Sequence, residues 1–240
     1  MDGIGPPLIV ALDHAETRDA RTCVSVLEGA AGRFKVGSAL FTRAGPSFVR
    51  ELVDRELGVF LDLKLHDTPA TVTGAVTASS DLGVEMITLH AAGGPAMIEA
   101  ARAAADRASA EGPKLLAVTV LTSLGEADWA RVSGAATRPI PEAVSALAGL
   151  ALEAGADGLV CSAHEVARLR AELGPEPLLV VPGIRPAWST SDHRGQSRTA
   201  EPGTALRDGA SWLVVGRAVT ADPDPRVAYD RIVADLEGIR

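Results

Sequence analysis

The chain has 240 residues, of which 47% are hydrophobic, and its 23 basic and 31 acidic residues give a net charge of −8. A chain of this length and composition can bury one sizeable core, so we expect a single domain over residues 1–240. The excess of negative charge argues against a nucleic-acid polymer or an anionic membrane surface as the main partner, so any phosphate ligand must be met by a local site.

The cysteine spacing and the first apolar run indicate the cellular compartment in which the protein is expected. Cys23 and Cys161 lie far apart, in no zinc-binding or disulfide-framework spacing, which favours a reducing environment. The run from Leu8 to Leu12 ends at Asp13, is too short for a secretion signal or a membrane span, and follows no basic segment. We therefore expect a soluble, cytoplasmic protein without membrane attachment.

Short aliphatic runs alternate with longer segments of helical period along the whole chain. Their continuous apolar character is typical of parallel strands covered on both faces. The eight predicted strands are Leu8–Leu12, Arg33–Gly37, Val59–Lys64, Met86–His90, Leu115–Leu121, Gly158–Cys161, Leu178–Val181 and Trp212–Gly216. Helical patterns between them begin near prolines such as Pro46 and Pro141, which suit a first turn. Eight such units favour an α/β fold of the (β/α)8 TIM-barrel type; an open doubly wound sheet is the alternative, although no GxGxxG follows the first strand.

Two connections are long for this architecture, residues 122–140 after the fifth strand and residues 183–201 after the seventh. Both follow the carboxyl ends of strands, the end of a barrel that carries the active site. The second is rich in Ser, Thr, Gly, His and Arg, which indicates a segment that grips a ligand. A surface loop without function is the alternative interpretation.

The third predicted strand ends in charged residues. Alternation along a strand puts Asp62 and Lys64 on one face, where burial is costly unless the two charges pair. Asp67 follows at once, and Asp13 and Lys35 stand at the ends of the first two strands, so five charges should converge on one barrel mouth. The alternative is a structural ion pair between Asp62 and Lys64 that stabilises the strand and has no catalytic role. The functional hypothesis is that such an array keeps its members ionised, so that Lys64 can stabilise and then protonate a carbanion without a metal.

The loops after the seventh and eighth strands usually form the phosphate site of this fold. Here they carry Pro182-Gly183-Ile184-Arg185 and Gly216-Arg217. Gly216 allows a backbone N–H to approach an anion, and Arg185 and Arg217 offer planar forks of donors. Gln196, in the long seventh loop, could close over the same group. A Gly-Arg pair by itself is also compatible with an ordinary turn.

Taken in chain order, these motifs resemble those of the bacterial orotidine 5'-phosphate decarboxylase family. The resemblance covers nearly the whole chain and rests on Leu12-Asp13, Phe34-Lys35-Val36-Gly37, Asp62-Leu63-Lys64-Leu65-His66-Asp67 with Pro69 and Thr71, Val120-Leu121-Thr122-Ser123, Pro182-Gly183-Ile184-Arg185 and Gly216-Arg217. It implies a (β/α)8-barrel enzyme that converts orotidine 5'-monophosphate to UMP and CO2 in pyrimidine biosynthesis, with neither a cofactor nor a metal.

The same resemblance implies catalytic roles. Lys64 would donate the proton and Asp62 would face the substrate carboxylate. Lys35 would complete the charge network and, with Asp13, hold the ribose hydroxyls. Asp67 would act in the site of a neighbouring subunit, so that the family resemblance implies a homodimer with shared active sites.

The remaining implied roles concern substrate binding. Thr71 would accompany Asp67 into the neighbouring site, and Ser123, with Thr122 beside it, would read the pyrimidine edge. The expected 5'-phosphate ligands are Arg185, Gln196, Gly216 and Arg217, and Pro182 is expected to contact the substrate.

The chain departs from the family pattern in two places. In the seventh loop it has Gly195-Gln196 and Glu201-Pro202, where an Asp-Gln pair and a Thr-Pro are usual. Thr68 and Ala70 replace an aliphatic residue and Asn, a change that could alter the subunit seam without changing the chemistry.

Two other functions remain open. One is a Mg2+-dependent sugar-phosphate decarboxylase or aldolase of the same suprafamily, although such enzymes carry Glu at the position of Lys35. The other is a catalytically silent nucleotide-binding relative, which would be expected to lose Lys64 or Asp62 first because these are costly to bury without use.

Overall fold

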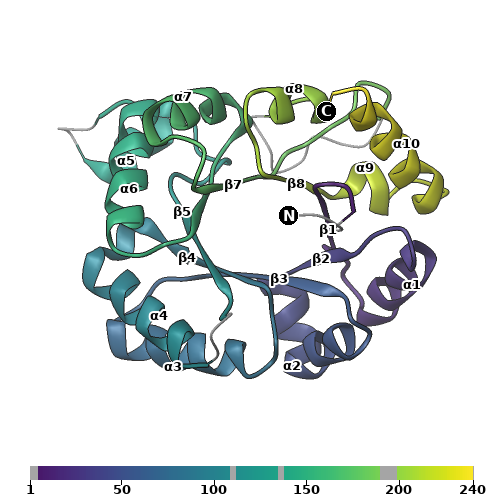
Figure 1. Ribbon diagram of the computed structural model, residues 1–240, viewed down its shortest axis with the longest axis horizontal. Coiled ribbons are helices and arrows are strands. Elements are labelled where there is room, and N and C mark those ends of the chain that lie inside the picture. The colour runs from purple at the N-terminus through teal and green to yellow at the C-terminus, as the bar shows by residue number, and fades with distance from the viewer. Residues whose placement is uncertain (1–4, 109–111, 135–137, 190–198, 240) are drawn as a thin grey trace.

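The computed structural model describes residues 5–108, 112–134, 138–189 and 199–239. Eight parallel strands close into a barrel in chain order, and β8 pairs with β1 (Figure 1). The strands are β1 (Leu8–Ala11), β2 (Arg33–Gly37), β3 (Gly58–Leu65), β4 (Met86–His90), β5 (Lys114–Val118), β6 (Gly158–Val160), β7 (Leu178–Val181) and β8 (Trp212–Val215). The predicted (β/α)8 barrel is confirmed.

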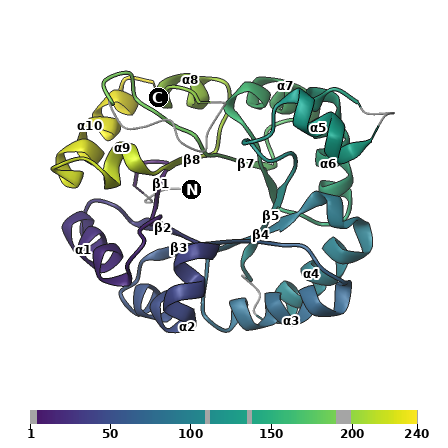
Figure 2. The ribbon, with the colours of Figure 1, turned by 180° about the vertical axis from the view of Figure 1, so that it is seen from behind.

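Helices form a ring around the barrel, which is visible from both sides (Figures 1 and 2). They are α1 (Thr17–Leu27), α2 (Ser38–Asp54), α3 (Pro69–Ser80), α4 (Pro95–Ala108), α5 (Glu126–Ser133), α6 (Ile140–Glu153), α7 (Ala163–Leu173), α8 (Pro202–Arg207), α9 (Arg217–Thr220) and α10 (Pro225–Glu237), with a 3-10 turn at Ala91–Gly93. The two predicted first-turn prolines are confirmed. Pro141 lies in the first turn of α6, and Pro46 follows Gly45, whose φ of 68° breaks α2 into two segments.

The structure corrects the predicted course of the chain after β5. The strand ends at Val118 and not at Leu121, and only a weak bond from the Thr119 amide to the Val160 carbonyl, at 3.5 Å, continues the ladder. The connection expected to be a long loop contains the helix α5, which has no buried residue. Its lack of an apolar buried stripe explains why hydrophobic periodicity did not reveal it.

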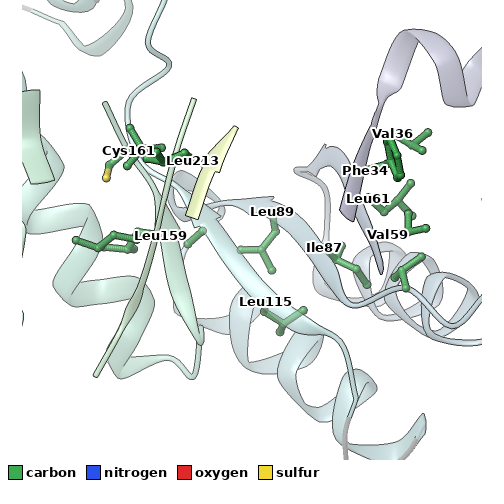
Figure 3. Close-up of a cluster of buried hydrophobic side chains, with 14 of the residues drawn as sticks. Phe34, Val36, Val59, Leu61, Ile87, Leu89, Leu115, Leu159, Cys161 and Leu213 are labelled. Carbon is green, nitrogen blue, oxygen red and sulfur yellow. The ribbon is translucent and has the colours of Figure 1, made fainter. Parts of the chain in front are cut away.

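Two apolar layers support the barrel. Because successive residues of a strand face opposite sides, Phe60 points into the barrel while Val59 and Leu61 pack against the helices. Figure 3 shows Val59 and Leu61 beside Phe34 and Val36 in this outer layer. The inner cluster is Ile9, Ala11, Phe60, Met86, Leu116, Val118, Val160, Val180 and Val214. Apolar side chains thus fill the barrel below its mouth.

Within the described residues, no helix is long and apolar enough to cross a membrane.

The contact between β6 and β7 depends on a glycine. Gly158 pairs with Leu178, and a Cβ atom at position 158 would collide with the carbonyl oxygen of Leu178. Backbone atoms of a closed barrel cannot move aside as a flexible side chain can, so the collision has to be relieved by shifting a strand.

We therefore expect Gly158→Ala to lower the free energy of unfolding by about 1–3 kcal/mol, measured by denaturant titration. Gly149→Ala is the control, because position 149 lies in α6 and a Cβ there meets nothing within 4 Å. The control should keep or gain stability, by up to about 1 kcal/mol, since alanine favours a helix. Equal stability of wild type and Gly158→Ala would contradict the assigned contact.

Candidate active site

A cavity of about 530 Å³ lies at the carboxyl end of the strands, where this fold carries its active sites. Its walls are apolar in the depth of the barrel and charged toward the mouth. The lining residues are Ala11, Asp13, Lys35, Phe60, Asp62, Lys64, Val118, Val120, Leu121, Thr122, Val160, Pro182, Gly183, Ile184, Arg185, Thr199, Val214, Gly216, Arg217 and Ala218. Most of the residues selected from the sequence therefore meet in one place.

Four charged side chains form a continuous row along one wall, and we call Asp13, Lys35, Asp62 and Lys64 the charge network. The Lys35 ammonium is 2.9 Å from Asp13 Oδ1 and 3.7 Å from Asp62 Oδ2, and the Lys64 ammonium is 2.7 Å from Asp62 Oδ1. Lys35 and Asp62 are 11% and 12% exposed, whereas Asp13 is 62% exposed. Acids and ammonium groups alternate, so each buried charge has an opposite charge beside it.

The pairing of β2 with β3 brings this row together. Gly37 stands opposite Asp62, and a Cβ atom at position 37 would lie 3.1 Å from the Lys35 ammonium and 3.5 Å from Asp13 Oδ1. The missing side chain leaves room for the ammonium between the two acids. Lys35 lies in the middle of β2 and not at its end as expected, and its long side chain carries the charge to the mouth. No role was predicted for Gly37, although it stands in one of the sequence motifs.

Lys64 has an unusual backbone. Its φ is 53°, a left-handed conformation that costs a non-glycine residue roughly 1–2 kcal/mol. The pairing of β3 with β4 also shifts here, since Leu61 pairs with Ile87 but Leu65 pairs with Leu89. The simple alternation used on the sequence therefore fails at Lys64. Asp62 and Lys64 still face the same cavity.

Thr88 is a site residue that the sequence did not reveal. It lies fully buried in β4, where its hydroxyl accepts the Lys64 backbone N–H at 2.8 Å and donates to Asp62 Oδ1 at 3.0 Å. The only available signal was a hydroxyl residue within the aliphatic run Met86–Leu89. Such a threonine is unremarkable in a sequence, because a buried hydroxyl usually bonds to a nearby backbone group.

Electrostatics keeps Asp62 ionised. Burial alone would raise the pKa of Asp62, but the charges of Lys35 and Lys64, with hydrogen bonds from Lys64 and Thr88, outweigh it and lower the pKa below its usual 3.8. Burial, and then repulsion from His66 and Lys64, lowers the pKa of His90, whose ring lies 5.2 Å from that of His66. At neutral pH Asp62 is therefore a carboxylate, and His90 is a neutral imidazole.

The part of the wall formed by the ends of β7 and β8 carries the predicted phosphate ligands, and Pro182 beside them. Pro182, Arg185, Gly216 and Arg217 all line the cavity, from the ends of β7 and β8, across the barrel from β3 (Figure 1). The Arg185 amide donates to the Ala200 carbonyl at 2.8 Å, and the Ala200 amide donates to the Gly183 carbonyl at 3.2 Å. These bonds fix both ends of the seventh connection beside the cavity.

Three predicted residues with described positions do not line this cavity. Asp67 is exposed and its Oδ1 accepts the Thr68 amide at 2.6 Å, so it does not flank Lys64 within one chain as the residue pattern suggested. Thr71 is exposed and lies 3.1 Å from the Thr68 hydroxyl. Ser123 is exposed next to Thr122, which lines the cavity. Gln196 lies outside the described residues.

Lysine usage is a sequence signal that was overlooked. Lys35, Lys64 and Lys114 are the only lysines among the 23 basic residues; all the others are arginines. Two of the three lie in the charge network. A guanidinium keeps its proton under all ordinary conditions, whereas an ammonium can give one up. Retention of lysine at these positions indicates a need for an ammonium.

Metal ligands do not gather in this region. Among the described residues, no group of three or more His, Cys, Asp or Glu is arranged to hold a metal ion. The space between the carboxylates of Asp13 and Asp62 is occupied by the Lys35 ammonium. A divalent cation at that point would be repelled by the lysine.

Comparisons with known proteins agree on one family. The sequence model of the orotidine 5'-phosphate decarboxylase / HUMPS family matches residues 6–232. Two curated relatives, both named orotidine 5'-phosphate decarboxylase, are 46% identical to this chain. The one from Nitrosococcus oceani aligns over 97% of this chain and 98% of its own length, and the one from Moorella thermoacetica over 97% and 93%.

Solved structures show the same likeness. The crystal structure of orotidine 5'-phosphate decarboxylase from Lactobacillus acidophilus has a TM-score of 0.84 and 37% identity, with 96% of this chain and 98% of that chain covered. An uncharacterized conserved protein from Geobacillus kaustophilus has the same TM-score at 33% identity, with 96% and 100% covered. The likeness therefore extends over essentially the whole barrel.

The depressed pKa of Asp62 predicts how acid affects stability. A carboxyl group whose pKa is lower in the folded chain stabilises it above the unfolded pKa, near 3.8, and this contribution is lost as pH falls through the folded pKa. Below pH 3.8 the free energy of unfolding of the wild type should therefore fall more steeply than that of Asp62→Asn, by up to about 1.4 kcal/mol per pH unit. Denaturant titrations at a series of pH values measure this, and parallel curves would argue against an ionised, paired Asp62.

Proposed function

The chain belongs to the orotidine 5'-phosphate decarboxylase / HUMPS family, and we propose that it decarboxylates orotidine 5'-monophosphate to UMP and CO2 without a cofactor. The observation that carries the proposal is the charge network on one wall of a cavity whose other wall presents Arg185 and Arg217. This arrangement fits a ligand with a reacting anionic group at one end and a phosphate at the other. The curated relatives carry the name of that activity.

Lys64 has the central role in the proposed chemistry. The bond between C6 of the pyrimidine and the carboxylate breaks, the electron pair stays on C6, and CO2 leaves. The resulting anion has no adjacent carbonyl to accept its charge, so a fixed cation must stabilise it. The Lys64 ammonium supplies that charge and then transfers a proton to C6, which gives UMP. The neutral amine regains its proton from solvent.

Asp62 would contribute by repulsion. It is held ionised by Lys35 and Lys64, and it faces the same cavity as the reacting group. A substrate carboxylate placed against it is destabilised by like charge, and this repulsion is relieved as neutral CO2 forms. Binding energy from the distant phosphate can hold the substrate in this position, although the phosphate does not react.

The other parts of the nucleotide would contact different groups of residues in the cavity. Asp13 and Lys35 would hold the ribose hydroxyls, and Thr122 and Ser123 would meet the pyrimidine edge. The 5'-phosphate would be bound by Arg185, Gly216 and Arg217, with Gln196 closing over it, and Pro182 would contact the substrate from the cavity wall. Guanidinium groups suit this task because they bind phosphate oxygens in pairs.

The Mg2+-dependent alternative is disfavoured by Lys35. Its ammonium lies 2.9 Å from Asp13 and 3.7 Å from Asp62, the two acids that a metal would use. The catalytically silent alternative is disfavoured by the complete charge network, since burying unused charges lowers stability.

A homodimer with shared sites would explain the surface around α3. Residues 69–80 contain no charged side chain, yet Ala70, Thr71, Gly74 and Ala78 are exposed. Depletion of charged residues is typical of the core of a protein–protein interface. Asp67 borders this surface, is exposed, and has no ion-pair partner within 4 Å among the described residues, so its carboxylate could enter a partner's cavity.

The cysteines support a reducing compartment, and we propose the cytoplasm. Cys23 and Cys161 are both buried and neither forms a disulfide, and burial raises the pKa of Cys23 to about 11. A protonated, buried thiol is inert to exchange. We also propose that residues 1–240 form one domain, because the eight strands close a single barrel.

The first test is the loss of orotidine 5'-monophosphate absorbance on adding purified protein in excess EDTA. We expect rapid turnover to UMP in the wild type and a loss of at least about 1,000-fold in Lys64→Ala, because both the cation and the proton donor are removed.

Lys114→Ala is the matched control, since Lys114 is exposed, lies outside the cavity and, among the described residues, pairs with Asp157. It should keep wild-type activity. Absence of wild-type turnover, or turnover only of a sugar phosphate with Mg2+, would refute the proposed function.

Shared sites can be tested by mixing two inactive variants. In a heterodimer of Lys64→Ala and Asp67→Ala, one site combines an intact Lys64 with an intact Asp67 from the partner. Random pairing of equal amounts should then restore about a quarter of wild-type activity, because half of the dimers carry one such site. Two inactive proteins that stay inactive after dissociation and reassociation would show that each site is built from one chain.

A further inference from the structure

Where the pairing of β3 with β4 is irregular, Thr88 is the one β4 residue opposite several residues of β3. Between the pairs Leu61 with Ile87 and Leu65 with Leu89, β3 has three residues and β4 has only Thr88. A regular ladder cannot satisfy the backbone groups of three residues with one partner. The Thr88 hydroxyl takes this position and accepts the Lys64 backbone N–H at 2.8 Å.

The hydroxyl has a single proton, and its direction is fixed by its partners. Because the oxygen accepts from the Lys64 amide, its own O–H is left to donate, and Asp62 Oδ1 lies 3.0 Å away. The same Oδ1 accepts the Lys64 ammonium at 2.7 Å. The bonds therefore form a closed ring that runs from the Lys64 backbone through Thr88 and Asp62 to the Lys64 side chain.

We propose that Thr88 is a positioning residue for decarboxylation. Its hydroxyl binds the Lys64 backbone N–H directly and holds the Asp62 oxygen that accepts the Lys64 ammonium. This inference rests on the proposed function. Thr88 is fully buried and does not line the cavity, so it acts through these two residues and not by touching substrate. It also stabilises Lys64 in its left-handed conformation, at φ 53°, which an ordinary strand would not hold.

The structure leads us to expect a specific kinetic effect. In Thr88→Val, which keeps the shape but lacks the hydroxyl, kcat should fall on the order of 10- to 100-fold, while KM changes by less than about 3-fold. The phosphate and ribose contacts that dominate binding are untouched, whereas the proton donor loses its fixed geometry. Thr88→Ser retains the hydroxyl and should recover kcat to within about 3-fold.

Thr119→Val is the matched control. Thr119 is a second buried threonine of the barrel, and within the described part of the chain its hydroxyl donates to the Val160 carbonyl alone, at 3.4 Å. Removing it takes away a buried hydroxyl without touching Asp62 or Lys64, so kcat should stay within about 3-fold of wild type. An equal fall in Thr119→Val and Thr88→Val would assign the effect to general barrel stability and overturn the proposal.

A measurement without substrate separates this proposal from the function on which it rests. The chain has only three lysines, so selective 15N-lysine labelling gives three backbone amide signals, and Lys64→Arg identifies that of Lys64. Thr88→Val should speed hydrogen exchange of the Lys64 amide by about 10-fold or more and leave those of Lys35 and Lys114 unchanged. If the wild type fails to convert orotidine 5'-monophosphate, the proposed function falls, while this exchange rate still decides whether Thr88 holds the Lys64 backbone.

The proposal is overturned if Thr88→Val keeps wild-type kcat, or if the Lys64 amide exchanges at the wild-type rate. Should Thr88→Val not fold, Thr88→Cys carries the same two measurements, because a thiol is of similar size and only a weak donor.

Discussion

The carboxylate of Asp62 lies buried between two ammonium groups, and the rest of the site depends on this arrangement. A carboxylate taken out of water without partners costs on the order of several kcal/mol, and each lysine offsets part of the cost of burying Asp62. Because Lys35 comes from β2, Lys64 from the end of β3 and Asp13 from beyond β1, the charges meet only when three strands close in register. The site is therefore complete only when these strands of the barrel are paired.

The apolar interior strengthens the electrostatic interactions within this charge network. Phe60 and the other inner side chains exclude water below the mouth, so charges interact across a medium of lower polarity than water. The cations that face the proposed phosphate are arginines on the far wall, whereas the cations beside the proposed reacting carbon are lysines. Arginine grips an anion without giving up its proton, and lysine can donate one. The two walls therefore divide binding from proton transfer by residue type.

Backbone irregularity also belongs to the site. Lys64 adopts a left-handed conformation where β3 and β4 change register, and the Thr88 hydroxyl accepts the Lys64 backbone N–H in place of a ladder partner. Strained backbone persists where surrounding contacts over-determine it, and such positions gather at functional sites. A helix surface without charge, at α3, lies immediately after the same strand. The catalytic strand and the proposed subunit contact are therefore adjacent, which suits a site shared between two chains.

The sequence by itself determined the eight-stranded barrel, because apolar runs and helical periods are local patterns that repeat in order along the chain. It also placed Asp13, Lys35, Asp62 and Lys64 at one mouth, since parallel strands end at the same edge. Only the tertiary structure decided that Lys35 sits between two acids and that Asp67 turns away, and only it revealed Thr88. Register shifts, left-handed residues and hydrogen bonds between neighbouring strands depend on pairings of residues far apart in the chain, and no local pattern encodes them.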